Sequence, residues 1–104
     1  MKFSVIYTTT GSIAEARKIA NMLVGERLAA CVNMFPIESL YRLKGELCNE
    51  KECGMIIKTA ENLVDDAIKK IKSMHSYKVP CIISFDIGNG DKEFLDWIAG
   101  EVKK

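Results

Sequence analysis

The sequence predicts an α+β fold of the ferredoxin-like (split βαβ) type, in which two helices cover one face of a four-stranded antiparallel sheet. Two apolar periodicities carry this prediction: alternation along four segments, and helical spacing along two others that separate them. Their order is β-α-β-β-α-β, followed by a short C-terminal helix. No linker, repeat or low-complexity tract interrupts the chain, so residues 1–104 are expected to form a single domain.

The first strand and the first helix have clear local signals. Residues 2–9 alternate and consist mostly of β-formers, which indicates a sheet strand. Ser12 and Glu15 form a capping box ahead of an apolar stripe at helical spacing, and Gly25 supplies a stop. We therefore expect a strand that leads directly into a helix.

A long bent hairpin is expected next. Residues 28–35 are apolar on both faces, as in a buried strand, and Pro36 predicts a bulge or bend because it lacks a backbone donor. Alternation then resumes as far as the polar stretch 49–52, which we interpret as the turn. Residues 53–59 would form the returning strand.

The second half of the chain predicts a helix, a strand and a short final helix. Asn62 and Asp65 are candidate caps for the second helix, which should end near His75. An extended link leads to the last strand, residues 81–87, and Asp91 is placed to cap the final helix.

The predicted sheet has one face that its own helices cannot cover. The strands are apolar on both sides, so other subunits are expected to cover the second face, and the edges of the hairpin offer strands for pairing. Phe94 and Trp97 lie three residues apart on the last helix. We expect both to lie inward, against their own subunit or a neighbour.

Composition excludes several classes of protein. The formal net charge is +1, which lacks the positive excess that nucleic-acid binding exploits. The apolar runs fall far short of the roughly 18 residues that a membrane helix requires. The first residues lack a full apolar signal core, so a cytoplasmic location is expected. We predict neither a nucleic acid nor a membrane as a partner.

The four cysteines are expected to be free thiols, because a domain with this much apolar core needs no disulfides. Cys48 and Cys53 flank the expected turn, where they could face each other as a disulfide, as two legs of a metal site, or as a thiol pair without function. Cys31 lies in an apolar run and is expected to be a small buried hydrophobe.

Nothing in the sequence predicts catalysis. A nucleophile-base pair, a glycine-rich phosphate loop and a metal motif of accepted spacing are all absent from the sequence, so we do not expect an enzyme. Residues 8–12 lead into a helix N-terminus, where anions can bind, but we interpret them as a strand exit followed by an ordinary Ser12 cap.

Several stretches together resemble one family, the CutA divalent-cation-tolerance proteins. The match begins with Leu-Ala-Ala-Cys-Val-Asn at residues 28–33, the family pattern LAACVN. It continues along most of the chain, at residues 39–41 before Gly45, at 57–59, at His75 with Tyr77, Val79 and Pro80, and at 94–98. The resemblance implies a tight homotrimer with PII-like architecture and a function linked to divalent metal (copper) tolerance.

The resemblance also implies where the chain departs from its family. Leu43 stands where the family often has tryptophan, and Ser76 replaces a proline. Tyr7 stands where some members have a cysteine proposed to contact copper, and Cys81 where most have glutamate. Two of three proposed ligand positions have therefore changed.

Two residues remain as candidate metal ligands. His75 is expected to end the second helix and Cys81 to open the last strand, so the two side chains could converge across the link between them. An imidazole and a thiolate would favour Cu(I) or zinc over hard ions. The alternative is that Cys81 packs in the core while His75 stabilises the helix C-terminus.

The resemblance places three further polar residues, Lys58, Tyr41 and Tyr77, near a cleft between subunits. Lys58 lies in an apolar strand, where it would bind an anion or simply point to solvent. A second hypothesis is therefore a PII-like signalling module that binds a small anionic ligand in intersubunit clefts and reports to an unidentified protein partner. A structural trimer without ligand is the third.

Overall fold

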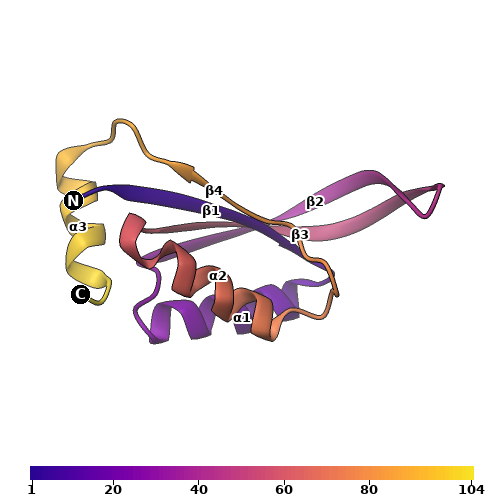
Figure 1. Cartoon of the computed structure of the whole chain (residues 1–104), viewed down its shortest axis with the longest axis horizontal. Helices are drawn as coiled ribbons and strands as arrows, with labels where there is room; N and C mark the ends of the chain where they lie inside the picture. The colour runs from indigo at the N-terminus through magenta and orange to yellow at the C-terminus, as the bar shows by residue number, and fades with distance from the viewer.

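The computed structural model describes residues 1–104 and has the predicted architecture. Its elements are β1 (Phe3–Thr10), α1 (Ile13–Gly25), β2 (Cys31–Leu43), β3 (Glu46–Ala60), the 3₁₀ turn η1 (Glu61–Leu63), α2 (Val64–Met74), β4 (Ile82–Asp86) and α3 (Lys92–Glu101). The antiparallel sheet has the order β2-β3-β1-β4. Helices α1 and α2 lie together on one face of it, and α3 lies at one end (Figure 1). The ferredoxin-like prediction is confirmed.

The main core lies between α1, α2 and the sheet. Ile6 of β1 is paired with Ile57 of β3, and both side chains are fully buried against α1 and α2 residues such as Ile19, Leu23 and Ile71. Burying one isoleucine side chain completely stabilises the folded chain by about 1.5–3 kcal/mol relative to leaving it exposed. A smaller cluster packs α3 against the other end of the sheet through Ile98 and Val102.

The hairpin turn does not lie at residues 49–52, where the sequence predicts it. The polar stretch 49–52 lies within β3, and the chain reverses at Lys44 and Gly45, whose φ angles are 50° and 82°. Two successive positive φ values are typical of the two-residue turn that matches the twist of a hairpin. The prediction was wrong because residues 49–52 are polar for another reason: β1 ends opposite Cys53, and beyond that point β3 has only β2 beside it.

The two-stranded extension of the hairpin is a ribbon formed by residues 37–52. It projects from the body of the sheet (Figure 1). Strand β2 runs into it without interruption at Pro36, so the expected bulge is absent. Strand β2 is an edge strand, where a missing backbone donor costs little.

The helix caps agree with the predictions at two of three positions. Ser12 accepts a hydrogen bond from the backbone nitrogen of Glu15, and Asp91 accepts one from that of Phe94. Asn62 and Asp65 cap nothing, because the chain enters α2 through the 3₁₀ turn η1 and no side chain bonds its N-terminus. The predicted caps of the second helix are therefore wrong.

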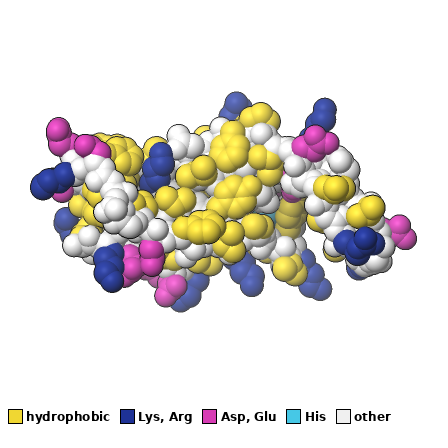
Figure 2. All heavy atoms as spheres, turned by 90° about the horizontal axis from the view of Figure 1, so that it is seen from above, with side chains coloured by type: hydrophobic (Ala, Val, Ile, Leu, Met, Phe, Trp, Pro, Cys, Tyr) yellow, Lys and Arg dark blue, Asp and Glu magenta, His cyan; other side chains and the backbone are white.

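The sheet face turned away from α1 and α2, here called the outer face, is apolar and largely open. Its apolar side chains include Val5, Tyr7, Phe35, Ile56, Ile83 and Phe85. Figure 2 views the molecule from above and shows hydrophobic side chains gathered over its middle. Ile83 is 48% exposed and Phe85 56% exposed.

The aromatic pair of α3 extends this exposed surface. Phe94 and Trp97 stack with their ring centroids 5.7 Å apart and are 41% and 44% exposed. The expectation that they lie inward against their own subunit is wrong. Ile98, the next residue after Trp97, faces inward instead and is fully buried. Burial of the pair against a neighbour stays a prediction.

Candidate functional site

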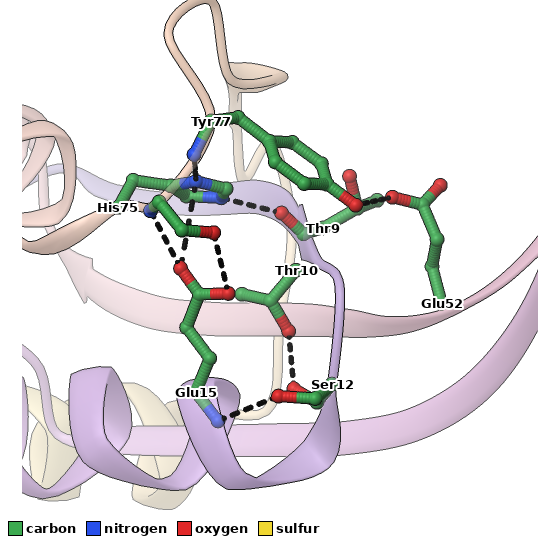
Figure 3. A network of polar contacts seen from close by, with 8 residues as sticks. Thr9, Thr10, Ser12, Glu15, Glu52, His75 and Tyr77 are labelled. Atoms are coloured by element: carbon green, nitrogen blue, oxygen red, sulfur yellow. Dashed lines mark hydrogen bonds and ion pairs between the residues drawn. The ribbon is translucent and has the colours of Figure 1, made fainter.

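The polar residues of the candidate site meet at the end of β1, where the link from α2 to β4 crosses it. His75 is the first residue after α2, and its side chain is fully buried. Its Nε2 lies 2.7 Å from the carbonyl oxygen of Thr9, and its Nδ1 accepts a hydrogen bond of 3.0 Å from the backbone nitrogen of Tyr77 (Figure 3). Both ring nitrogens therefore have partners within the fold.

Glu15 of α1 holds the same link, which comprises residues 75–81, through hydrogen bonds to Ser76. Its carboxylate accepts hydrogen bonds from the backbone nitrogen of Ser76 at 2.7 Å and from the Ser76 hydroxyl at 3.0 Å. Burial alone would raise the pKa of Glu15, but the hydrogen bonds from Ser76 and from the backbone of Gly11 lower it. The carboxylate is therefore held in its charged form.

Tyr77 joins the link to β3. Its hydroxyl donates a 2.6 Å hydrogen bond to Glu52, and that bond, followed by burial and the negative charges of Glu52 and Glu50, raises its pKa (Figure 3). A Cβ atom added at Gly11 would lie 3.2 Å from the Tyr77 hydroxyl oxygen, so the ring closes over that glycine. The link is thus tied to β1, α1 and β3 at once.

The predicted cleft residues are only partly brought together. Tyr41 donates a 2.9 Å hydrogen bond to Glu50, and this bond is the main cause that raises the pKa of Tyr41 to about 12. The negative charge of Glu50 also raises the pKa of Tyr77. The two tyrosines therefore meet at one pair of glutamates on β3. Lys58 lies farther along β3, where its Nζ donates to Asn33 at 2.7 Å and lies 5.6 Å from the centroid of the Phe94 ring. It is placed apart from the tyrosines.

The predicted metal pair has one buried and one accessible member. Cys81 is exposed, immediately before β4. Burial is the main cause that raises the pKa of Tyr7, followed by the negative charges of Cys81 and Glu52. No three side chains of the types that hold metals gather in one protomer. A metal site formed by His75 and Cys81 stays a prediction.

The other cysteines do not form the predicted pair. Cys48 and Cys53 lie on the same strand, opposite Tyr41 and Pro36 respectively, because the turn lies elsewhere. They do not face each other, and all four cysteines are free. Cys31 is half-buried on the outer face, where it was expected to be buried.

A cavity of about 320 Å³ lies beside this network, at the N-terminus of α1. Gly11, Ser12, Lys51 and Glu52 contribute to its wall. Two of the hydroxyls that lead into the helix already have partners: Thr10 donates to the carbonyl oxygen of Ser12 at 2.7 Å, and the Ser12 hydroxyl caps α1. Lys51 is the cationic group beside the cavity.

Sequence patterns did not indicate Glu15 and Glu52 as site residues. Glu15 was assigned to a capping box, yet its carboxylate bonds Ser76, far along the sequence. Glu52 was assigned to a turn and proves to hold Tyr77. The only available signal was that both are acidic residues at segment ends, which by itself indicates capping or a turn.

Comparison with known proteins identifies the family. Residues 4–101 match the family of CutA1 divalent ion tolerance proteins. The chain belongs to the CutA1 family. It is 45% identical, over 89% of its length and 91% of the relative's, to a divalent-cation tolerance protein CutA of Archaeoglobus fulgidus. It is 36% identical, over 96% and 98%, to that of Pyrococcus horikoshii.

Solved CutA structures share the fold. The A. fulgidus structure, described as a periplasmic divalent cation tolerance protein, has a TM-score of 0.95 and 42% identity, covering 97% of this chain and 99% of its own. CutA1 of Oryza sativa has a TM-score of 0.97 and 33% identity, covering 100% and 96%. A relative from Arabidopsis thaliana is described as chloroplastic, so CutA proteins occur in more than one compartment. None of the helices of this chain has the length and apolar character needed to cross a membrane.

Proposed function

We propose that this chain acts as a cytoplasmic homotrimer in tolerance of divalent cations, copper included. The match to CutA1 proteins over residues 4–101 carries this proposal, because the matched relatives are named for divalent-cation tolerance. Those names describe tolerance and no reaction, so the proposal assigns the chain no catalytic step.

The outer face supports the assembly. A single chain leaves four large apolar side chains exposed to water: Ile83, Phe85 and the stacked pair Phe94 and Trp97. Contact with further copies of the chain would cover them, and cyclic closure gives each copy the same neighbours. The three-fold number comes from the PII-like architecture of the family.

Light scattering tests the assembly. A trimer should have three times the chain mass of 11.6 kDa at all working concentrations. A soluble, folded species with the mass of one chain at micromolar concentration would contradict the proposal.

Growth in copper tests the function. A bacterium that lacks its own CutA protein should grow at a higher copper concentration when it expresses this chain than when it carries an empty vector. Zinc and cobalt in place of copper would measure the range of cations. Equal growth with and without the chain, at matched expression, would refute the tolerance function.

A PII-like module that binds a small anion is the second candidate function. The cavity beside Ser12 and Lys51 favours it, because a cation and a helix N-terminus both attract negative charge. Thermal shift with nucleotides and with dicarboxylates should then show concentration-dependent stabilisation. A melting temperature that none of these ligands changes would leave this candidate without support.

A further inference from the structure

The metal that the family name implies does not fit the donor atoms of His75. Metal ligation requires an imidazole nitrogen with a free lone pair. The Thr9 carbonyl can only accept, so Nε2, 2.7 Å away, carries the ring proton and donates it. Nδ1 then has the only lone pair, and the Tyr77 backbone N–H occupies it at 3.0 Å.

The surroundings of Nδ1 reinforce this assignment. The side chain of His75 is fully buried, so a metal ion could reach Nδ1 only after the link had moved. The nearest carboxylate, Glu15, lies 3.7 Å from Nδ1, and both of its oxygens accept hydrogen bonds from Ser76. A metal at Nδ1 would displace the Tyr77 amide and disturb the ties of Glu15 to the link. The Tyr77 ring also packs against the imidazole, with centroids 5.0 Å apart.

We infer that His75 is a positioning residue in its neutral Nε2–H form, which ties the link to β1 and presents Tyr77 to Glu52, and that it is no metal ligand in the folded chain. Any metal that the folded protein takes up leaves the imidazole unchanged. Of the predicted pair, Cys81 alone is accessible to an ion from solvent. The inference departs from the ligand position that the family resemblance implies.

Nitrogen-15 NMR of the trimer tests the inference directly. The chain has one histidine, so its ring signals need no assignment by mutation. In metal-free protein at pH 7, Nε2 should be protonated and Nδ1 unprotonated. Both signals should stay unchanged when Zn²⁺, and in a separate sample Cu(I), is added to excess. A metal-induced shift of either ring nitrogen while the protein stays folded would overturn the inference.

A pair of variants provides a second readout. Glutamine can donate to Thr9 and accept from Tyr77, so His75→Gln should retain the Tyr77 environment seen by NMR, while His75→Ala should lose it. Zinc affinity of folded His75→Gln, measured by equilibrium dialysis, should equal that of the parent. A tenfold loss of affinity in that variant would overturn the inference. Neither outcome bears on trimer mass or copper tolerance, so the proposed function is tested separately.

Discussion

The two faces of the sheet bury apolar side chains in different ways. On the face toward α1 and α2, Ile6, Met55 and Ile57 are fully buried within one chain. On the outer face, the neighbouring residues Val5 and Ile56 are half-buried, and Phe85 is mostly exposed. The same strands supply both sets, because successive side chains of a strand point to opposite faces.

This difference separates folding from assembly. The helix-covered face forms the core that stabilises the single chain. The apolar side chains of the outer face stay partly exposed in a single chain. Under the proposed trimer, a substitution on one face should change the stability of the chain, and one on the other should change its association. Adjacent residues of one strand can therefore have unrelated effects.

Placing a charge on the outer face should have the largest effect. Phe85→Asp would bury a carboxylate between subunits, which is strongly unfavourable, so the trimer should dissociate to folded monomers with one third of the mass. Light scattering and circular dichroism measure mass and folding together. Ala14→Asp introduces the same charge at an exposed position of α1 and should remain trimeric. A Phe85→Asp protein that stays trimeric would show that the outer face is not the interface.

The two adjacent isoleucines of β3 offer a matched test of the comparison. Ile57→Ala should lower the free energy of unfolding by about 2–5 kcal/mol, because it leaves a cavity in the closed core. Ile56→Ala should cost less than half as much when both are measured by urea denaturation in the monomeric Phe85→Asp background. Equal costs would mean that the faces are equally packed within one chain.

One point on the outer face is already closely packed. A Cβ atom added at Gly54 would lie 2.7 Å from Cε2 of Phe35 and 3.1 Å from Cγ2 of Ile37. Gly54→Ala should therefore destabilise by about 1–3 kcal/mol in urea denaturation. Gly100 lies in α3 with open space around it, and Gly100→Ala should stabilise by up to about 1 kcal/mol. A neutral Gly54→Ala would show that Phe35 moves aside freely.

The contribution of Glu15 to the free energy of unfolding should depend on pH and not on the association of the chains. Because the folded pKa of Glu15 is lowered, its contribution to stability is full above its ordinary value of 4.5 and is lost as the pH falls through the folded value. The stability difference between the parent and Glu15→Gln should therefore be largest near pH 7 and shrink below pH 4.5. Urea denaturation at several pH values measures it, and a constant difference would contradict the lowered pKa.

Sequence periodicity predicted the elements well, because alternation and helical spacing reflect which side chains of an element face the core. The turn was misplaced where burial ceases: residues 49–51 are exposed in the two-stranded ribbon and Glu52 is half-buried, and the polarity of this stretch resembles that of a loop. Phe94 and Trp97 were misjudged because apolarity cannot distinguish a core from an interface.

The sequence indicated several residues of the candidate site, but it did not indicate the contacts that these residues make. His75, Tyr77 and Tyr41 do belong to polar networks. Their partners Thr9, Glu52 and Glu50 come from other strands, and local patterns carry no information about contacts across the fold. Ser12 and Asp91 were correct because a cap is decided within three residues.

The two-residue turn at Lys44 and Gly45 governs more than the tip of the ribbon. It pairs Leu43 with Glu46, and the same register continues without a bulge to Cys31 and Lys58. Adding one residue to the turn would shift every one of these pairs by one position, and in one strand the side chains would exchange sides. The length of this exposed turn therefore decides which residues of the hairpin belong to the single chain and which are left for its neighbours.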